Sequence, residues 1–154
     1  MTQDTPQSAS KTLPKKECRI SLRLVLDESQ SVGRKNWDAQ VNATANALMH
    51  PQITEAIELL GPVAVSIDGF SKMPRPMVGW QVIVNAVDAA VVAAELKEAG
   101  KTYANGGTEI DLALINAIDG FKTTPCPRAD RIIDLSTDGQ DSDGDTGKGQ
   151  MSMQ

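Results

Sequence analysis

The sequence predicts an α/β fold: a doubly wound, mostly parallel sheet flanked by helices. Short runs of Val, Ile, Leu and Ala alternate along the chain with longer segments whose apolar residues recur at helical spacing. Strands that alternate with helices favour a parallel sheet, because a crossover brings each strand back in the same direction. Aromatic residues make up only 3% of the chain, so the core must be built from aliphatic side chains.

One domain is expected in this chain. A length of 154 residues is enough for a single hydrophobic core and too short for two. Residues 1–17 are rich in Thr, Gln, Ser, Pro and Lys and have little to bury, so we predict a disordered tail there. Residues 141–154 are predicted to form a flexible acidic and glycine-rich tail, which leaves residues 18–140 as the domain.

The first half of the domain contains two expected strands with helical segments between them. An apolar run over residues 20–26 ends at Asp27, which is typical of a buried strand that delivers a polar side chain to its end. Pro51 ends the helix that follows, and a short second helix is expected at residues 53–60. The second strand is expected at residues 63–70. The apolar positions of the first helix are Trp37, Val41, Ala45, Leu48 and Met49.

The second half adds two strands and two helices. A shorter strand is expected at residues 78–84, at an edge of the sheet. Asn85 and Asp88 form a capping pair for the next helix, and a further helix is expected to begin at Thr108. The last strand is expected at residues 131–137. The apolar stripe predicted for the last helix consists of Ile110, Ala113, Leu114, Ala117, Ile118 and Phe121.

Charge and hydropathy exclude several classes of function. The net charge is −5 and no basic cluster is longer than a dipeptide, so we do not expect nucleic-acid binding. No apolar run approaches the roughly 20 residues that a membrane span needs. The N-terminus has no apolar core of a secretory signal, so the sequence as written predicts a cytoplasmic protein.

Oxygen-bearing side chains gather at the carboxyl ends of the expected strands. Asp27, Ser29 and Ser31 alternate directly after the first strand, Thr108 lies in an NGGT loop, and Asp138 follows the last strand. Because ligands bind at the carboxyl edge of a parallel sheet, we expect these five side chains to lie close together. Hard oxygen ligands suit Mg²⁺, Mn²⁺ or Ca²⁺ rather than zinc or copper. The sequence therefore predicts a divalent-cation site.

Some of these positions also have purely structural interpretations. Thr108 with Asp111 matches a capping box for the helix that it opens, and Asp138 with Gly139 matches a turn. To explain all five positions in this way, the string of Asp27, Ser29 and Ser31, the cap at Thr108 and the turn at Asp138 would have to be three unrelated coincidences. The acidic run at residues 141–145 begins like a calcium-binding loop but lacks the glycine and glutamate of such a loop, so a solvated loop is expected there.

The strings DESQS, GGT and TDG, in this order and spacing, resemble the metal-ion-dependent adhesion site of von Willebrand factor type A (vWA) domains. The likeness is closest to a largely uncharacterised bacterial subgroup, through the segments ALMHPQITEAIELLGPVAVSIDGFS, GGTEIDLALINAI and RADRIIDLSTDG. It covers residues 19–139 and implies a Rossmann-like vWA fold. It also implies that the serines and the threonine coordinate the metal directly or through water, and that the aspartates mostly hold coordinated waters.

The function that the resemblance implies is an adhesion or interaction module, in which Mg²⁺ (or Mn²⁺ or Ca²⁺) bridges to an acidic side chain of a protein partner. We do not expect an enzyme, because no His or Lys is placed to activate Ser29 or Ser31. A metal-assisted hydrolase would need Glu28 or Glu109 as its general base, and it ranks last. The other alternative is a metal-free interaction domain, or a truncated relic of a vWA protein.

The resemblance also bears on the cysteines and on the end of the chain. The family's strand order places Cys18 and Cys126 before neighbouring strands, so we expect them close together at the edge opposite the metal, with a bond between them left open. A disulfide would suit an oxidising compartment, and relatives with signal peptides leave a periplasmic or secreted location open. The sequence lacks the family's last strands and helices. We expect the strand at residues 131–137 to keep an open edge that a second chain or copy completes.

Overall fold

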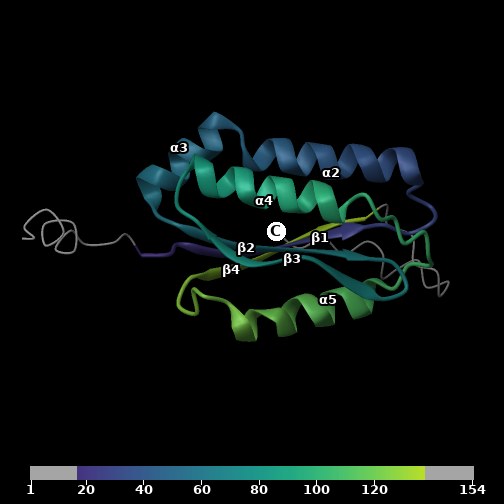
Figure 1. Cartoon of the computed structure of the whole chain (residues 1–154). Helices are drawn as coiled ribbons and strands as arrows, with labels where there is room; N and C mark the ends of the chain where they lie inside the picture. Colours follow the sequence, from purple (N-terminus) through teal and green to yellow (C-terminus); the bar gives the residue numbers. More distant parts are fainter. Residues whose placement is uncertain (1–16, 138–154) are drawn as a thin grey trace, which may run out of the picture.

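The sheet has β1 (Ile20–Asp27) inside it, with a parallel neighbour on each side. Within residues 17–137, the part of the chain that the computed structural model describes, four strands form one sheet in the order β3-β2-β1-β4 (Figure 1). β1 pairs in parallel with β2 (Val63–Phe70) and β4 (Asp130–Ser136), while β3 (Pro74–Ile83) pairs antiparallel with β2. The predicted mostly parallel sheet is confirmed.

Helices cover both faces of this sheet. Figure 1 shows α2 (Arg34–Leu48), α3 (Pro51–Leu60) and α4 (Ala86–Ala99) on one face and α5 (Ile110–Asp119) on the other. The core under α2 and α4 is aliphatic except for one buried tryptophan. A second core lies under α5 and the short 3₁₀ helix η1 (Gly120–Thr123). None of the helices in the described part of the chain is long and apolar enough to cross a membrane.

Side chains cap the starts of two helices, one of which the sequence predicted. His50 is the N-cap of α3, and its Nδ1 accepts a hydrogen bond from the backbone N–H of Gln52 at 3.1 Å. Asn85 caps α4 by accepting from the N–H of Asp88 at 3.0 Å. The Asp88 carboxylate in turn accepts from the N–H of Val84 at 2.9 Å, so the predicted capping pair is confirmed.

Three details differ from the sequence-based expectations. β3 begins at Pro74 rather than at residue 78, because an edge strand can tolerate the missing N–H groups of proline. α5 begins at Ile110 with Glu109 as its N-cap, so Thr108 belongs to the preceding loop. Ile118 was predicted to lie on the buried stripe, but its side chain is 59% exposed.

A buried ion pair lies on the sheet face that α5 covers. Arg23 of β1 donates hydrogen bonds to Asp68 and to Ser66 of β2, the latter at 2.9 Å. Asn116 of α5 donates to the Asp68 carboxylate at 3.1 Å, which fastens the helix to the sheet. Burial raises the pKa of Asp68 above its ordinary value, while the Arg23 guanidinium and the Asn116 amide act in the opposite direction and offset only part of it.

The raised pKa of Asp68 predicts how stability depends on pH. Between the unfolded pKa of about 4 and the higher folded pKa, the folded protein binds more protons than the unfolded chain. Relative to the Asp68→Asn variant, the free energy of unfolding of the wild type should therefore fall as the pH rises through this window. Urea denaturation of both proteins at several pH values measures the slope of this difference. A difference that increases with pH would show that the ion pair with Arg23 outweighs burial.

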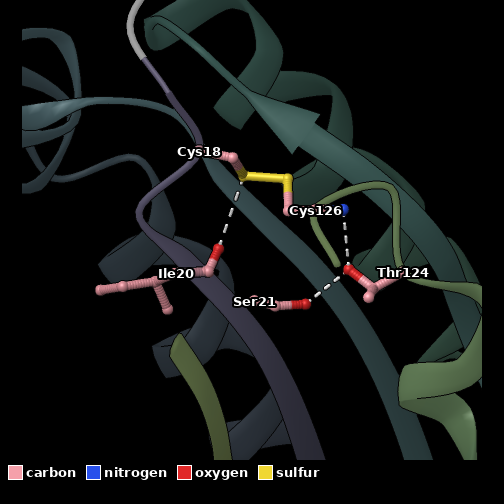
Figure 2. Close-up of a disulfide and its surroundings, with 5 residues drawn as sticks. All are labelled: Cys18, Ile20, Ser21, Thr124 and Cys126. Carbon is pink, nitrogen blue, oxygen red and sulfur yellow. Dashed lines mark hydrogen bonds between the residues drawn. A yellow bond between two sulfur atoms is a disulfide. The ribbon is translucent and has the colours of Figure 1, made fainter. Parts of the chain in front are cut away.

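A disulfide joins the amino ends of β1 and β4. Figure 2 shows Cys18 bonded to Cys126. Their Cα atoms lie 5.9 Å apart, and the two residues are 108 positions apart in the sequence. Next to it, the hydroxyl groups of Ser21 and Thr124 are hydrogen-bonded at 2.6 Å, and the N–H of Cys126 donates to Thr124 Oγ1 at 3.1 Å. The expected proximity of the two cysteines is confirmed, and the pair is bonded.

Loss of this disulfide should destabilise the fold. Because the bond closes a long loop of the unfolded chain, we expect Cys18→Ser with Cys126→Ser to lower the free energy of unfolding by about 2–4 kcal/mol. Urea denaturation with and without dithiothreitol tests this, and the double variant should not respond to the reductant. Two free thiols in the denatured, unreduced wild type would contradict the bond.

Candidate metal site

Asp27 ends β1 at the carboxyl edge of the sheet, directly opposite Phe70 at the end of β2. Its side chain is buried, and both oxygens accept hydrogen bonds: Oδ1 from the N–H of Ser29 and Oδ2 from the hydroxyl of Thr137, each at 2.8 Å. The carboxylate thus fastens the turn after β1 to the residue that follows β4. An ionised carboxylate has about four lone-pair sites, so Asp27 retains acceptor capacity for water.

The two serines of the motif share one turn. Their hydroxyl oxygens lie 3.2 Å apart, and Ser29 is buried while Ser31 is exposed. Adjacent ligands in an octahedron lie about 2.9 Å apart around Mg²⁺ and about 3.4 Å apart around Ca²⁺, given the usual metal–oxygen distances. In this structure the two hydroxyl groups are hydrogen-bonded to each other, and the separation of their oxygens is also compatible with two neighbouring ligands of a divalent cation.

The loop before α5 runs alongside this turn. Ser29 and Gly106 form an isolated parallel bridge, and the N–H of Gln30 donates to the carbonyl of Gly106 at 2.7 Å. Thr108 lies two residues further on, is only 4% exposed, and is followed by Glu109, whose N–H donates to the carbonyl of Ser71 beyond β2 at 2.9 Å. These backbone contacts bring the loop of Thr108 to the edge where Asp27 and the two serines lie.

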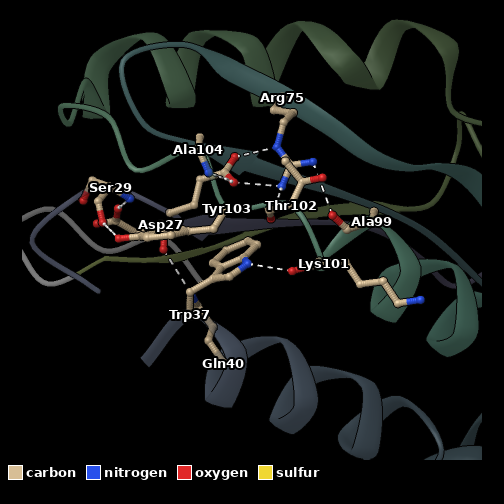
Figure 3. Close-up of polar contacts among 12 residues, drawn as sticks. Asp27, Ser29, Trp37, Gln40, Arg75, Ala99, Lys101, Thr102, Tyr103 and Ala104 are labelled. Carbon is tan, nitrogen blue, oxygen red and sulfur yellow. Dashed lines mark hydrogen bonds and ion pairs between the residues drawn. The ribbon is translucent and has the colours of Figure 1, made fainter. Parts of the chain in front are cut away.

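Tyr103 braces the same turn, and the sequence analysis missed it. Its hydroxyl donates to the carbonyl of Ser29 at 2.7 Å and accepts from the N–H of Gly33 at 3.0 Å. Its ring stacks on Trp37 of α2, with the centroids 6.2 Å apart, and Trp37 Nε1 donates to the carbonyl of Gly100 at 2.9 Å (Figure 3). The one signal in the sequence is that the chain's single tyrosine stands just before the NGGT loop.

Glu28 lies between two candidate ligands but is held by Arg75. The guanidinium donates to both carboxylate oxygens at 2.8 Å, and the N–H of Ala104 donates to Oε1 at 3.2 Å. The side chain of Glu28 is fully buried. These contacts leave Glu28 poorly suited to act as the general base that a hydrolase would need.

The structure therefore brings four of the five predicted ligand positions to one edge of the sheet, and the fifth lies outside the described residues. Asp27, Ser29, Ser31 and the loop of Thr108 meet at one edge, whereas Asp138 and the acidic run at residues 141–145 lie outside the described residues. Among residues 17–137, no three His, Cys, Asp or Glu side chains cluster as a metal site would. A cation here would instead bind mainly hydroxyl and water oxygens, which is a donor set of the kind that hard cations accept.

A comparison with known protein families identifies the family of this chain. The model of a family described as "Protein of unknown function (DUF1194)" matches residues 17–153. The chain belongs to this family. Curated proteins include no significant match.

Solved structures show which fold the family member adopts. It resembles the vWF domain of the type V pili tip protein Mfa5 from Porphyromonas gingivalis, with 16% identity, a TM-score of 0.57, and 81% of this chain and 39% of the other covered. It also resembles the pilus adhesin SpaC from Lactobacillus rhamnosus GG (20%, TM-score 0.61, 82% and 16% covered). A von Willebrand factor type A protein from Catenulispora acidiphila is similar too (22%, TM-score 0.60, 86% and 30% covered). The fold is thus vWA-like, and the chain spans less than half of each of these proteins.

Proposed function

We propose that this DUF1194 protein is a divalent-cation-dependent binding module for a protein partner. The observation that carries the proposal is the pair of hydroxyl oxygens of Ser29 and Ser31, 3.2 Å apart, beside the buried carboxylate of Asp27. The likeness to domains of a pilus adhesin and a pili tip protein supports an interaction role. Metal dependence is the part that remains to be measured.

Each residue of the site has a proposed part. Ser29, Ser31 and Thr108 would offer hydroxyl oxygens to a cation, Mg²⁺ first and Mn²⁺ or Ca²⁺ as alternatives. Asp27 would accept hydrogen bonds from coordinated water while it holds the turn through Ser29 N–H. Asp138, the next residue in the sequence after Thr137, is proposed to have the same part. A bound cation would supply positive charge and a coordination position for a carboxylate of the partner.

The disulfide supports a proposal about location. Structural disulfides persist in oxidising compartments and are rare in the cytosol of most organisms. We therefore propose that the protein works in the periplasm or outside the cell, in place of the cytoplasmic location that the sequence as written predicts.

Cation binding should raise the stability of the folded chain. At a hundredfold excess over the dissociation constant, a cation that binds only the folded state adds about 2.7 kcal/mol. We expect thermal unfolding to shift upward with millimolar Mg²⁺, Mn²⁺ or Ca²⁺, and chelation to reverse the shift.

Two variants separate loss of a ligand from loss of the fold. Asp27→Ala removes a buried side chain with two hydrogen bonds, whereas Ser31→Ala changes an exposed side chain, so the second should keep the fold and still lose most of the cation-dependent shift. Asp38→Ala is the matched control, because its carboxylate is about half exposed and pairs with Arg34 on α2, away from the candidate ligands. A wild type that is indifferent to all three cations would favour the metal-free interaction domain.

The edge at β4 is a second place where a partner can bind. In the described part of the sheet, β4 pairs only with β1, and an open groove of about 1310 Å³ lies beside the amino ends of both strands. The groove is lined mainly by aliphatic side chains, most of them from α3, β1 and β2, and Ile132 of β4 adds one more.

We propose that a second chain or copy completes the sheet at β4, because an unpaired strand edge presents free backbone donors and acceptors. Sedimentation velocity at micromolar concentration should show a dimer or larger species. A folded, non-aggregating monomer would contradict this proposal.

A further inference from the structure

We propose that Glu28 and Arg75 are a positioning pair, which holds the loops of the candidate cation site at fixed spacing before the cation binds. Glu28 lies between Asp27 and Ser29 in the chain, but its buried carboxylate binds Arg75 through two hydrogen bonds of 2.8 Å. A parallel pair of charge-assisted hydrogen bonds of this kind fixes orientation as well as distance. The inference rests on the cation-dependent function proposed above.

Three segments of the chain meet at this pair, and Figure 3 shows Arg75 beside Ala99, Thr102 and Ala104. Glu28 follows the end of β1, and Arg75 belongs to β3. Arg75 also donates to the carbonyl oxygens of Ala99, the last residue of α4, at 3.4 Å and of Thr102, three residues further on, at 3.3 Å. The N–H of Ala104 completes the set by donating to Glu28 Oε1 at 3.2 Å. The pair therefore joins β1 and β3 to the segment that leads from α4 to α5.

Because Gly69 has no side chain, there is room beside it for the carboxylate of Glu28. A Cβ atom at position 69 would lie 2.5 Å from Glu28 Oε2, closer than any real contact allows. Gly69 is also the partner of Arg75 in the pairing of β2 with β3, so the strand register brings the guanidinium to the same place. The register of β2 with β3 and the lack of a side chain at Gly69 thus allow Glu28 and Arg75 to meet.

The contacts of Glu28 are directly connected to the candidate ligands. Its backbone carbonyl accepts from the N–H of Asn105 at 3.1 Å, and the next bond along the two loops joins Gln30 to Gly106 at 2.7 Å. These bonds set the distance between the turn of the two serines and the loop that carries Thr108. If the pair of Glu28 and Arg75 is removed, the hydrogen bonds of the buried Glu28 carboxylate to Arg75 and to the N–H of Ala104 are lost as well. Outer contacts that orient metal ligands are typically worth 10–100-fold in metal affinity.

The test measures Mn²⁺ and Mg²⁺ binding by isothermal titration calorimetry. Arg75→Lys keeps the charge but cannot donate in the same forked geometry, and we expect about 10–100-fold weaker binding. Because neutralising Arg75 alone would leave the buried charge of Glu28 unpaired, Glu28→Gln with Arg75→Gln removes both charges at once and should weaken binding to a similar extent. Amide hydrogen exchange without any cation should show faster exchange at Gln30, Ala104 and Asn105 in both variants.

Two controls separate positioning from general stability. Arg34→Lys makes the same chemical change at an exposed arginine that donates to the Lys101 carbonyl near the same edge, and it should leave cation affinity unchanged. Cys126→Ser lowers stability at the opposite edge and should likewise leave affinity unchanged. Unchanged affinity in folded Arg75→Lys, or an equal loss in Cys126→Ser, would overturn the positioning role while the proposed function stands. A wild type that binds neither cation would overturn both.

Discussion

Parallel pairing on both sides of β1 is the constraint on which the rest of this structure depends. Parallel strands can be joined only by crossovers, so α2 and α3 lead from β1 to β2, and α4 and α5 lie between β3 and β4. The carboxyl ends of β1, β2 and β4 then lie at one edge of the sheet, together with the loops that leave them. Because β1 lies between β2 and β4, the turn that follows Asp27 has the end of a parallel strand on each side.

The two edges of the sheet carry different kinds of contact. At the amino edge, a disulfide and the hydrogen bond between Ser21 and Thr124 join β1 to the segment that precedes β4. At the carboxyl edge, loops contact each other through backbone bonds and through buried polar side chains such as Glu28 and Tyr103. The amino edge of the sheet is thus held by a disulfide and a buried hydrogen bond, whereas the oxygen atoms of the candidate site lie at the carboxyl edge. This division suits a binding domain, because the site can vary without disturbing the opposite edge.

Several buried polar side chains are required by the fold itself. The ion pair of Arg23 with Asp68 occupies a position where an aliphatic side chain would otherwise fill the core under α5. Because Asn116 and the ion pair share the Asp68 carboxylate, they fix where α5 lies on the sheet. α5 begins two residues after Thr108, so its placement also bears on the loop of the candidate site. Polar contacts of this kind specify a single arrangement more strictly than aliphatic packing does.

Local patterns in the sequence were enough to predict many of the elements and part of the site. Strand periodicity predicted β1 and β2, the capping pair of Asn85 and Asp88 predicted the start of α4, and the alternation of Asp27, Ser29 and Ser31 placed three oxygens in one turn. Each of these features is set by residues within a few positions of one another, where backbone geometry follows directly from residue type.

Tertiary structure alone decided the contacts between distant residues. Glu28 and Arg75 are 47 positions apart, and Ser29 and Tyr103 are 74 apart. The two cysteines, 108 positions apart, were expected to lie close together, but the structure decided that they are bonded. No periodicity in the chain reports which of many arginines or carboxylates will meet, because that depends on strand register and on how the loops pack. The sequence by itself therefore determined the fold class and the residue types at the carboxyl edge. The folded chain determined which of these side chains lie together at the candidate site and which, like Glu28, are held by a partner.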